Sequence, residues 1–168
     1  MTRGWNALIP ETATWHYADR SLTTAEIIRQ FYQDVRAGAG DDTIVIGCNT
    51  IGHLAAGLVE VSRIGDDTSG REWARTCKMG VNSLAFRGPQ HGTFFAADAD
   101  CVGLTKTEQI PWRYNRQWMD LVARSGTPLF ISFKKGSLAP AQEQEVADAL
   151  AIAARPPALG EPLDWMET

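Results

Sequence analysis

The sequence lacks the features that mark several common classes of protein. Its 168 residues contain no apolar run near the roughly 18 residues of a membrane-spanning helix, and the first twenty lack a signal peptide's hydrophobic region. Basic residues are not in excess, because 16 Lys and Arg stand against 20 Asp and Glu, a net charge of -4. No basic stripe is therefore available for a phosphate backbone. We expect a cytoplasmic protein that binds neither membranes nor nucleic acids.

Residues that build disulfides, metal sites and cofactor sites are also scarce. The three cysteines are odd in number and lie about 25 residues apart, so they fit neither a disulfide framework nor a C-x-x-C metal knuckle. The three histidines lack metal-ligand spacing. No G-x-G-x-x-G, Walker or G-x-S-x-G motif is present. We expect reduced cysteines, no metal and no cofactor.

What the sequence does contain is an alternation of strand and helix patterns. Thr23 and Glu26 form a capping-box pattern ahead of a helix that ends near Gly38, and the segment from Ser69 to Glu72 forms another, opening a helix through Cys77. The segment 82–86 fits either a strand or a helix. The remaining expected elements are strands at 43–48, 58–64, 93–97 and 128–133 and helices at 111–124 and 140–154.

The alternation predicts an α/β fold with a parallel sheet, either a barrel or a doubly wound sheet. Because the nucleotide-binding motifs typical of a doubly wound sheet are absent, we favour the barrel. We divide the chain into a loop segment at 1–22, a β/α region at 23–154 and a Pro-rich tail at 155–168.

Polar residues follow three of the four expected strands. Asn49 and Thr50 follow the first strand, Asp66 and Asp67 the second, and the Asp98-Ala99-Asp100 segment the third. Active sites of parallel α/β folds lie at the carboxyl ends of the strands, so these carboxylates can come together in one pocket at that end of the sheet.

Two carboxylates in one pocket suit cleavage of a glycosidic bond. One protonates the leaving oxygen, and the other meets the charge that develops at the sugar carbon. Burial beside a second carboxylate would raise the pKa of the acid and keep it protonated. The alternative is that these residues only cap helices and solvate loops. Of the six tryptophans, Trp118 is expected in the core, and Trp5 and Trp15 are the candidates for stacking on a sugar ring.

The motifs resemble a known family when they are taken together. Gly47-Cys48 ends a strand, Arg63-Ile64-Gly65-Asp66-Asp67 follows, and then His91-Gly92 precedes an apolar strand that ends in Asp98-Ala99-Asp100-Cys101. In order, spacing and strand placement this set resembles the α-galactosidase clan of retaining glycoside hydrolases. The resemblance covers roughly residues 21–132. It implies the carboxyl-terminal half of a (β/α)8 barrel, about strands five to eight.

The resemblance also implies roles for single residues. Asp67 would be the general acid/base, and Arg63 would contact the sugar hydroxyls beside the reacting carbon. The other residues that it places in the substrate-binding pocket are Cys48, Asp66, Asp98 and Asp100. The implied activity is hydrolysis of terminal α-linked sugars, and the implied partner is a carbohydrate.

The chain departs from the family pattern at several positions. Asn49 stands where the family has a glycine, Asp66 stands where proline is common, and Ala97 and Ala99 replace Asn and Pro. The family's nucleophile lies in a Lys-x-Asp motif at the end of the fourth strand, and no lysine of this chain has an aspartate two residues on. We expect the chain to begin just after that strand, so the nucleophile would lie in an absent half.

Two consequences and two alternatives follow. Half a barrel has two open edges, so we expect the chain to associate with itself or with a missing amino-terminal half. The alternatives are a non-catalytic carbohydrate-binding or structural α/β protein and a small α/β hydrolase or transferase of another kind.

The isolated chain should show no measurable hydrolysis of a nitrophenyl α-galactoside, because the two-step retaining route needs a covalent nucleophile. The measurement is release of nitrophenol from the purified chain. Robust release that Asp67→Asn abolishes would show that a nucleophile is present after all.

Overall fold

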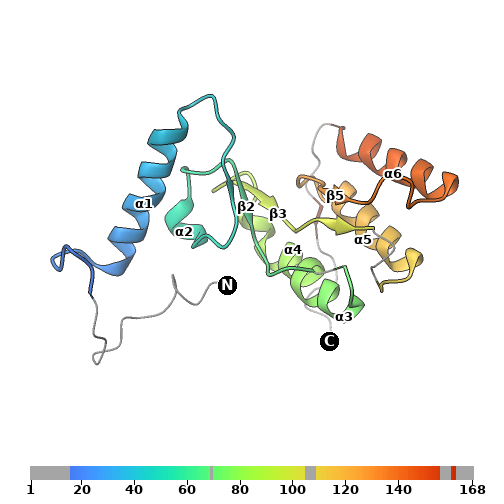
Figure 1. Cartoon of the computed structure of the whole chain (residues 1–168), viewed down its shortest axis with the longest axis horizontal. Helices are drawn as coiled ribbons and strands as arrows, with labels where there is room; N and C mark the ends of the chain where they lie inside the picture. The colour runs from blue at the N-terminus through green and yellow to red at the C-terminus, as the bar shows by residue number, and fades with distance from the viewer. Residues whose placement is uncertain (1–15, 69, 105–108, 156–159, 162–168) are drawn as a thin grey trace.

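Strands and helices alternate along the computed structural model, which describes residues 16–68, 70–104, 109–155 and 160–161 (Figure 1). The first three strands form a parallel sheet in the order β1-β2-β3, and the next two form a parallel pair. The strands are β1 (Ile46–Gly47), β2 (Val61–Arg63), β3 (Ala96–Asp98), β4 (Val102–Gly103) and β5 (Ile131–Ser132). Each expected strand overlaps an observed strand that is shorter, and β4 has no counterpart among the expected strands.

β3 and β4 are two parts of one extended stretch. Between them lie only Ala99, Asp100 and Cys101, and Asp100 has a positive φ of 86°. Its left-handed backbone breaks the strand, because a residue with φ above zero cannot continue the pleat. β3 pairs with β2, and β4 pairs with β5. The break at Asp100 therefore separates the parallel strands into two open sheets.

Helices lie before, between and after the strands along the chain. The longest are α1 (Thr24–Ala39), α5 (Trp112–Arg124) and α6 (Pro140–Ala153). The shorter ones are α2 (Gly52–Ala55), α3 (Trp73–Thr76), the π-helical turn η1 (Cys77–Val81), α4 (Asn82–Arg87) and the 3₁₀ turn η2 (Gly88–Gln90). α1 and α2 lie at one end of the elongated molecule and α5 and α6 at the other (Figure 1).

The helix boundaries test the capping patterns. The Thr23 side chain accepts a hydrogen bond from the Glu26 amide while the Glu26 carboxylate accepts one from the Thr23 amide, so the first capping box is confirmed. The helix that the second pattern predicts through Trp73 and Cys77 is present as α3 and η1. α3 begins at Trp73, and its cap residue Glu72 makes no side-chain capping bond. Ser69, the predicted cap, lies outside the described residues. The ambiguous segment 82–86 is helical.

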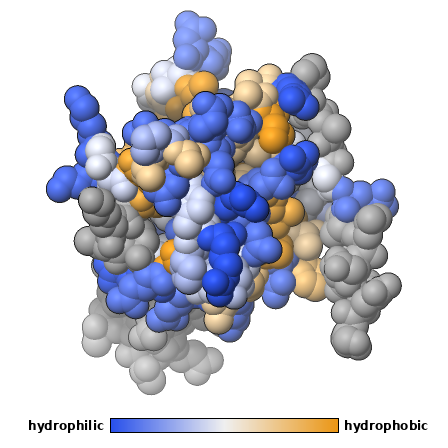
Figure 2. Space-filling model, turned by 90° about the vertical axis from the view of Figure 1, so that its right-hand side faces the viewer, coloured by the Kyte–Doolittle hydropathy of each residue, from blue (hydrophilic) through white to orange (hydrophobic). Residues whose placement is uncertain are grey.

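The core consists of two clusters, one at each end of the molecule. Ile28 and Tyr32 of α1 pack with Ile64 and Phe95 in the first, and Trp118 lies in the second, as expected for a core tryptophan. The surface around α5 and α6 is mostly hydrophilic, with apolar side chains in between (Figure 2). In the described part of the chain, no helix has the length and apolar character to cross a membrane.

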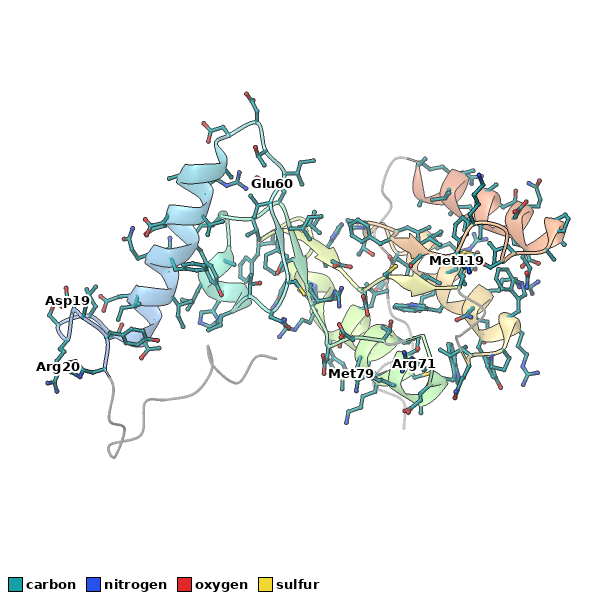
Figure 3. All side chains as sticks on the ribbon, in the orientation of Figure 1. Asp19, Arg20, Glu60, Arg71, Met79 and Met119 are labelled. Atoms are coloured by element: carbon teal, nitrogen blue, oxygen red, sulfur yellow. The ribbon has the colours of Figure 1, made fainter. Side chains whose placement is uncertain are left out.

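Two glycines allow the loop after β2 to pack against η1. A Cβ on Gly65 would lie 2.1 Å from the carbonyl oxygen of Met79, and one on Gly80 would lie 2.7 Å from the Trp118 ring and 3.1 Å from the Thr68 methyl. Met79 lies on the turn below the sheet (Figure 3). The backbones of the loop and of η1 therefore touch directly. This contact fixes the position of residues 66–68 relative to η1.

Gly65→Ala should lower the free energy of unfolding by about 1–3 kcal/mol, because the new methyl overlaps a backbone carbonyl that cannot move alone. The measurement is urea unfolding followed by tryptophan fluorescence. Gly38→Ala in α1 is the control, since its Cβ meets nothing within 4 Å and should leave stability unchanged or raise it. Equal effects of the two substitutions would show that the close approach is absent.

Candidate functional site

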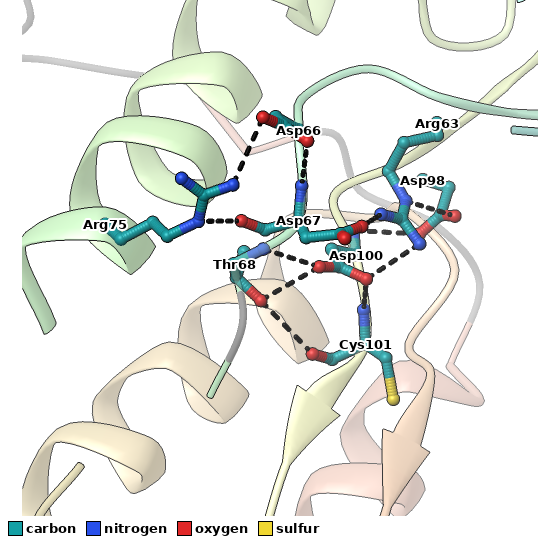
Figure 4. Close-up of polar contacts among 8 residues, drawn as sticks. All are labelled: Arg63, Asp66, Asp67, Thr68, Arg75, Asp98, Asp100 and Cys101. Atoms are coloured by element: carbon teal, nitrogen blue, oxygen red, sulfur yellow. Dashed lines mark hydrogen bonds and ion pairs between the residues drawn. The ribbon is translucent and has the colours of Figure 1, made fainter. Parts of the chain in front are cut away.

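The polar residues that follow β2 and β3 meet in one network (Figure 4). β2 and β3 are adjacent and parallel, and Arg63 lies in register with Asp98, so the residues after each strand emerge on the same side. Asp67 follows β2 by four residues, and Asp100 lies in the break between β3 and β4. Sheet register therefore brings together residues that are more than thirty positions apart in the sequence.

Arg63 is the centre of this network. Its Nε donates to Asp98 Oδ2 at 3.0 Å, one terminal nitrogen lies 2.7 Å from Asp100 Oδ1, and the other lies 3.2 Å from Asp67 Oδ1. The Arg63 side chain is 16% exposed, and Asp98 and Asp100 are buried. Buried carboxylates need a paired cation and further hydrogen bonds, and this fork of three donors supplies the pairing.

Asp100 connects the two strand ends. Its Oδ2 accepts hydrogen bonds from the Thr68 amide at 2.7 Å and the Thr68 hydroxyl at 3.0 Å, and its Oδ1 accepts one from the Cys101 amide at 2.6 Å. The Asp100 amide donates to Asp98 Oδ1 at 2.8 Å. These bonds and the Arg63 contact hold the left-handed backbone of Asp100 in place.

Asp67 is held from two sides, and its carboxylate remains open to solvent. The Asp66 carboxylate accepts from the Asp67 amide at 2.8 Å, and Arg75 donates to the Asp67 carbonyl at 2.7 Å and contacts Asp66 Oδ2 at 3.1 Å. The Asp67 side chain is 74% exposed and touches only the Arg63 guanidinium among these groups. The sequence analysis expected the catalytic acid to be buried beside a second carboxylate. The described structure differs, because Asp67 is exposed and contacts a guanidinium.

The charges of the network perturb two of its groups. Burial lowers the pKa of the Arg63 guanidinium, but the hydrogen bond with Asp98 and the charges of Asp100, Asp98 and Cys48 together raise it above its usual range. The pKa of Asp66 is lowered, first by the hydrogen bond from the Asp67 amide and then by Arg75. A carboxyl group whose pKa is lowered by folding stabilises the fold at any pH above its pKa in the unfolded chain. That contribution is lost as the pH falls through the pKa in the folded protein.

A hollow of about 420 Å³ lies beside Asp67 at the carboxyl ends of the strands. Gly103 and Ser132, the last residues of β4 and β5, form one wall. The other described residues of its lining are Asp67, Thr68, Gly70, Arg71, Asp100 and Cys101. Arg71 lies close to the start of α3 (Figure 3). The hollow is open to solvent, and the charged residues Asp67 and Arg71 are part of its lining.

The sequence-predicted residues divide into two places. Arg63, Asp66, Asp67, Asp98 and Asp100 share the network. Cys48 directly follows β1, is exposed and lines a different hollow between β1 and α1. The proposed sugar platform of Trp5 and Trp15 lies outside the described residues. Among the described histidines, cysteines and carboxylates, no group of three or more could hold a metal ion.

The structure adds residues that the sequence reasoning did not single out. Thr68 and Arg75 bind the main chain and carboxylates of the motif, and Ser132 comes to the hollow from β5. The contact of Arg75 could have been predicted from the sequence, since a basic residue in the helix that follows an acidic pair can reach back to that pair. The position of Ser132 could not, because it depends on the pairing of β4 with β5.

Comparison with known proteins gives no identification, because no family model and no curated protein matches the chain.

Arg63→Met should lower the free energy of unfolding by about 3–5 kcal/mol, because it leaves Asp98 and Asp100 buried without their cation. The measurement is urea unfolding at neutral pH. Arg124→Met is the matched control, since it removes an exposed ion pair with Asp120 and should cost at most about 1 kcal/mol. A small and equal loss in the two variants would contradict a buried network centred on Arg63.

Proposed function

We propose that the chain is the carboxyl-terminal half of the catalytic barrel of a retaining glycoside hydrolase that acts on terminal α-linked sugars. Asp67 is the general acid/base, and the nucleophile comes from the other half of the barrel. The preference for galactose rests on the motif resemblance alone. The proposed location is the cytoplasm, because the three cysteines are odd in number and lack the spacing of a disulfide framework.

The observation that carries the proposal is the contrast between Asp67 and its neighbours. Asp98 and Asp100 are buried and bound to Arg63, whereas Asp67 presents an exposed carboxylate at the wall of the hollow. An acid/base group must reach the substrate, and a group bound on every side cannot transfer a proton. The parallel strands place Asp67 at their carboxyl ends, which is where α/β enzymes carry their sites.

The residues around Asp67 fit the two steps of a retaining reaction. In the second step a general base accepts a proton from water, and the 3.2 Å contact with Arg63 positions the Asp67 side chain for this role. In the first step the group must be protonated, and a nearby second carboxylate would favour protonation of one of the two. That second carboxylate would be the nucleophile of the other half. Arg63 acts here through Asp67, as a positioning residue.

A second candidate is a carbohydrate-binding protein without catalysis. The observation that favours it is the ion pair between Asp67 and Arg63, because a charged carboxylate held by a guanidinium can accept hydrogen bonds from sugar hydroxyls without transferring a proton. Both candidates use the same hollow, and they differ in whether a nucleophile joins it.

The experiment is a titration of the ¹⁵N-labelled chain with methyl α-galactoside, followed by amide chemical shifts. We expect the shifts to concentrate on residues that line the hollow, including Asp67, Arg71 and Ser132. Asp67→Ala should weaken binding by about tenfold, because it removes the exposed carboxylate among the described residues of the lining, and a tenfold change corresponds to about 1.4 kcal/mol.

The matched control for this titration is Asp120→Ala. Asp120 is also an exposed aspartate paired with an arginine, but it lies on α5 away from the hollow lining. This variant should bind the sugar as the unsubstituted chain does. Shifts that are absent, or that scatter over the surface and respond equally to both substitutions, would rule out a sugar site at the hollow.

A further inference from the structure

Arg71 is the cationic residue among the described residues that line the hollow beside Asp67. It lies in the loop between β2 and α3, close to the start of α3 (Figure 3). Gly70, directly before it, has a positive φ of 65°, a backbone conformation that residues with a side chain rarely adopt. The chain therefore turns sharply at Gly70 and places Arg71 at the wall of the hollow.

Arg71 differs from the other two arginines of this region in having no carboxylate partner. Arg63 is bound to three aspartates of the network, and Arg75 is bound to Asp66 at 3.1 Å. Arg71 is exposed, and its side chain forms no hydrogen bond or ion pair with any residue that the structure describes. A guanidinium carries five N–H donors and no acceptor, so these donors are available to a ligand.

The described lining offers a suitable group for each part of an acidic sugar. The exposed carboxylate of Asp67 accepts hydrogen bonds from sugar hydroxyls, and the Ser132 hydroxyl both donates and accepts. Two parallel N–H groups of a guanidinium, such as that of Arg71, match the two oxygens of a carboxylate. The volume of about 420 Å³ falls within the roughly 300–1,000 Å³ of small-ligand pockets.

The charge of the surrounding network favours a ligand with a single negative charge. Its four aspartates stand against two bound arginines, which leaves two negative charges, and Arg71 reduces this surplus to one. A dianion such as a phosphate monoester would be repelled by the remaining carboxylates more strongly than a monoanion. A carboxylate brings one charge, which one guanidinium balances.

We propose that Arg71 selects an acidic sugar by binding the carboxylate of a uronic acid unit, with the hydroxyls and the glycosidic oxygen of that sugar toward Asp67. The substrate class is then a terminal α-linked uronide and not a neutral α-galactoside. This inference rests on the sugar site of the proposed function, and it adds the chemical class of the sugar. Arg71 determines specificity and takes no part in proton transfer.

The experiment compares two sugars that differ at one carbon. Methyl α-galacturonide carries a carboxylate where methyl α-galactoside carries a hydroxymethyl group, and each is titrated into the full ¹⁵N-labelled chain at neutral pH. We expect the galacturonide to bind about tenfold more tightly, with amide shifts at Arg71 and Ser132. This advantage should shrink between about 0.01 M and about 1 M salt, because the Debye length falls from about 30 Å to about 3 Å.

Two substitutions test whether Arg71 is the source of the preference. Arg71→Gln should weaken the galacturonide by about tenfold and leave the galactoside unchanged, since the neutral sugar has no carboxylate for Arg71 to bind. Arg29→Gln on α1 is the matched control. Arg29 is also exposed and without a side-chain partner among the described residues, but it is not in the lining of the hollow. It should change neither affinity.

Three results would overturn the proposal while leaving a sugar site at Asp67. They are equal affinities for the two sugars, equal weakening of both by Arg71→Gln, and tighter binding of methyl α-galactoside 6-phosphate than of the galacturonide. The last result would show a phosphate site. In each of these cases methyl α-galactoside still binds in the hollow. If neither sugar binds there, this inference and the proposed function fail together.

Discussion

The ion cluster of Arg63 with Asp98 and Asp100 is the interaction on which the rest of the site depends. It joins β2 to the break between β3 and β4, and it neutralises two buried carboxylates that the fold could not otherwise hold. Through Thr68 it also fixes the loop that carries Asp67. The aspartates of this network therefore have different roles. Asp98 and Asp100 are buried in the ion cluster, and Asp67 stays exposed as the candidate for chemistry.

Much of the local structure could be predicted from the sequence, because it depends on short-range rules. The capping box at Thr23 and Glu26, the proline that opens α6 and the burial of Trp118 follow from cap chemistry, backbone constraint and periodicity. The convergence of the residues after β2 and β3 was also predictable, since adjacent parallel strands send their carboxyl ends to one side. The roles assigned to those residues through the motif resemblance stay predictions.

What the sequence did not reveal depends on tertiary contact. The break at Asp100 is held by bonds from Thr68 and Arg63, which are distant in sequence, so no local pattern announces it. The helix through Cys77 was predicted, but α3 begins only at Trp73, because a capping pattern alone does not fix the first residue of a helix. The exposure of Asp67 and the burial of Asp98 could not be predicted, because sheet register decides which of the carboxylates bound to Arg63 is covered.

The central claim is that Arg63 binds the buried Asp98 and Asp100 as structure, whereas its contact with the exposed Asp67 contributes little to stability. The most direct measurement is a pair of double-mutant cycles in urea unfolding, one for Arg63 with Asp100 and one for Arg63 with Asp67. The account predicts a coupling of about 1–3 kcal/mol for the buried Asp100 pair and well under 1 kcal/mol for the exposed Asp67 pair. Equal couplings, or the larger one with Asp67, would contradict it.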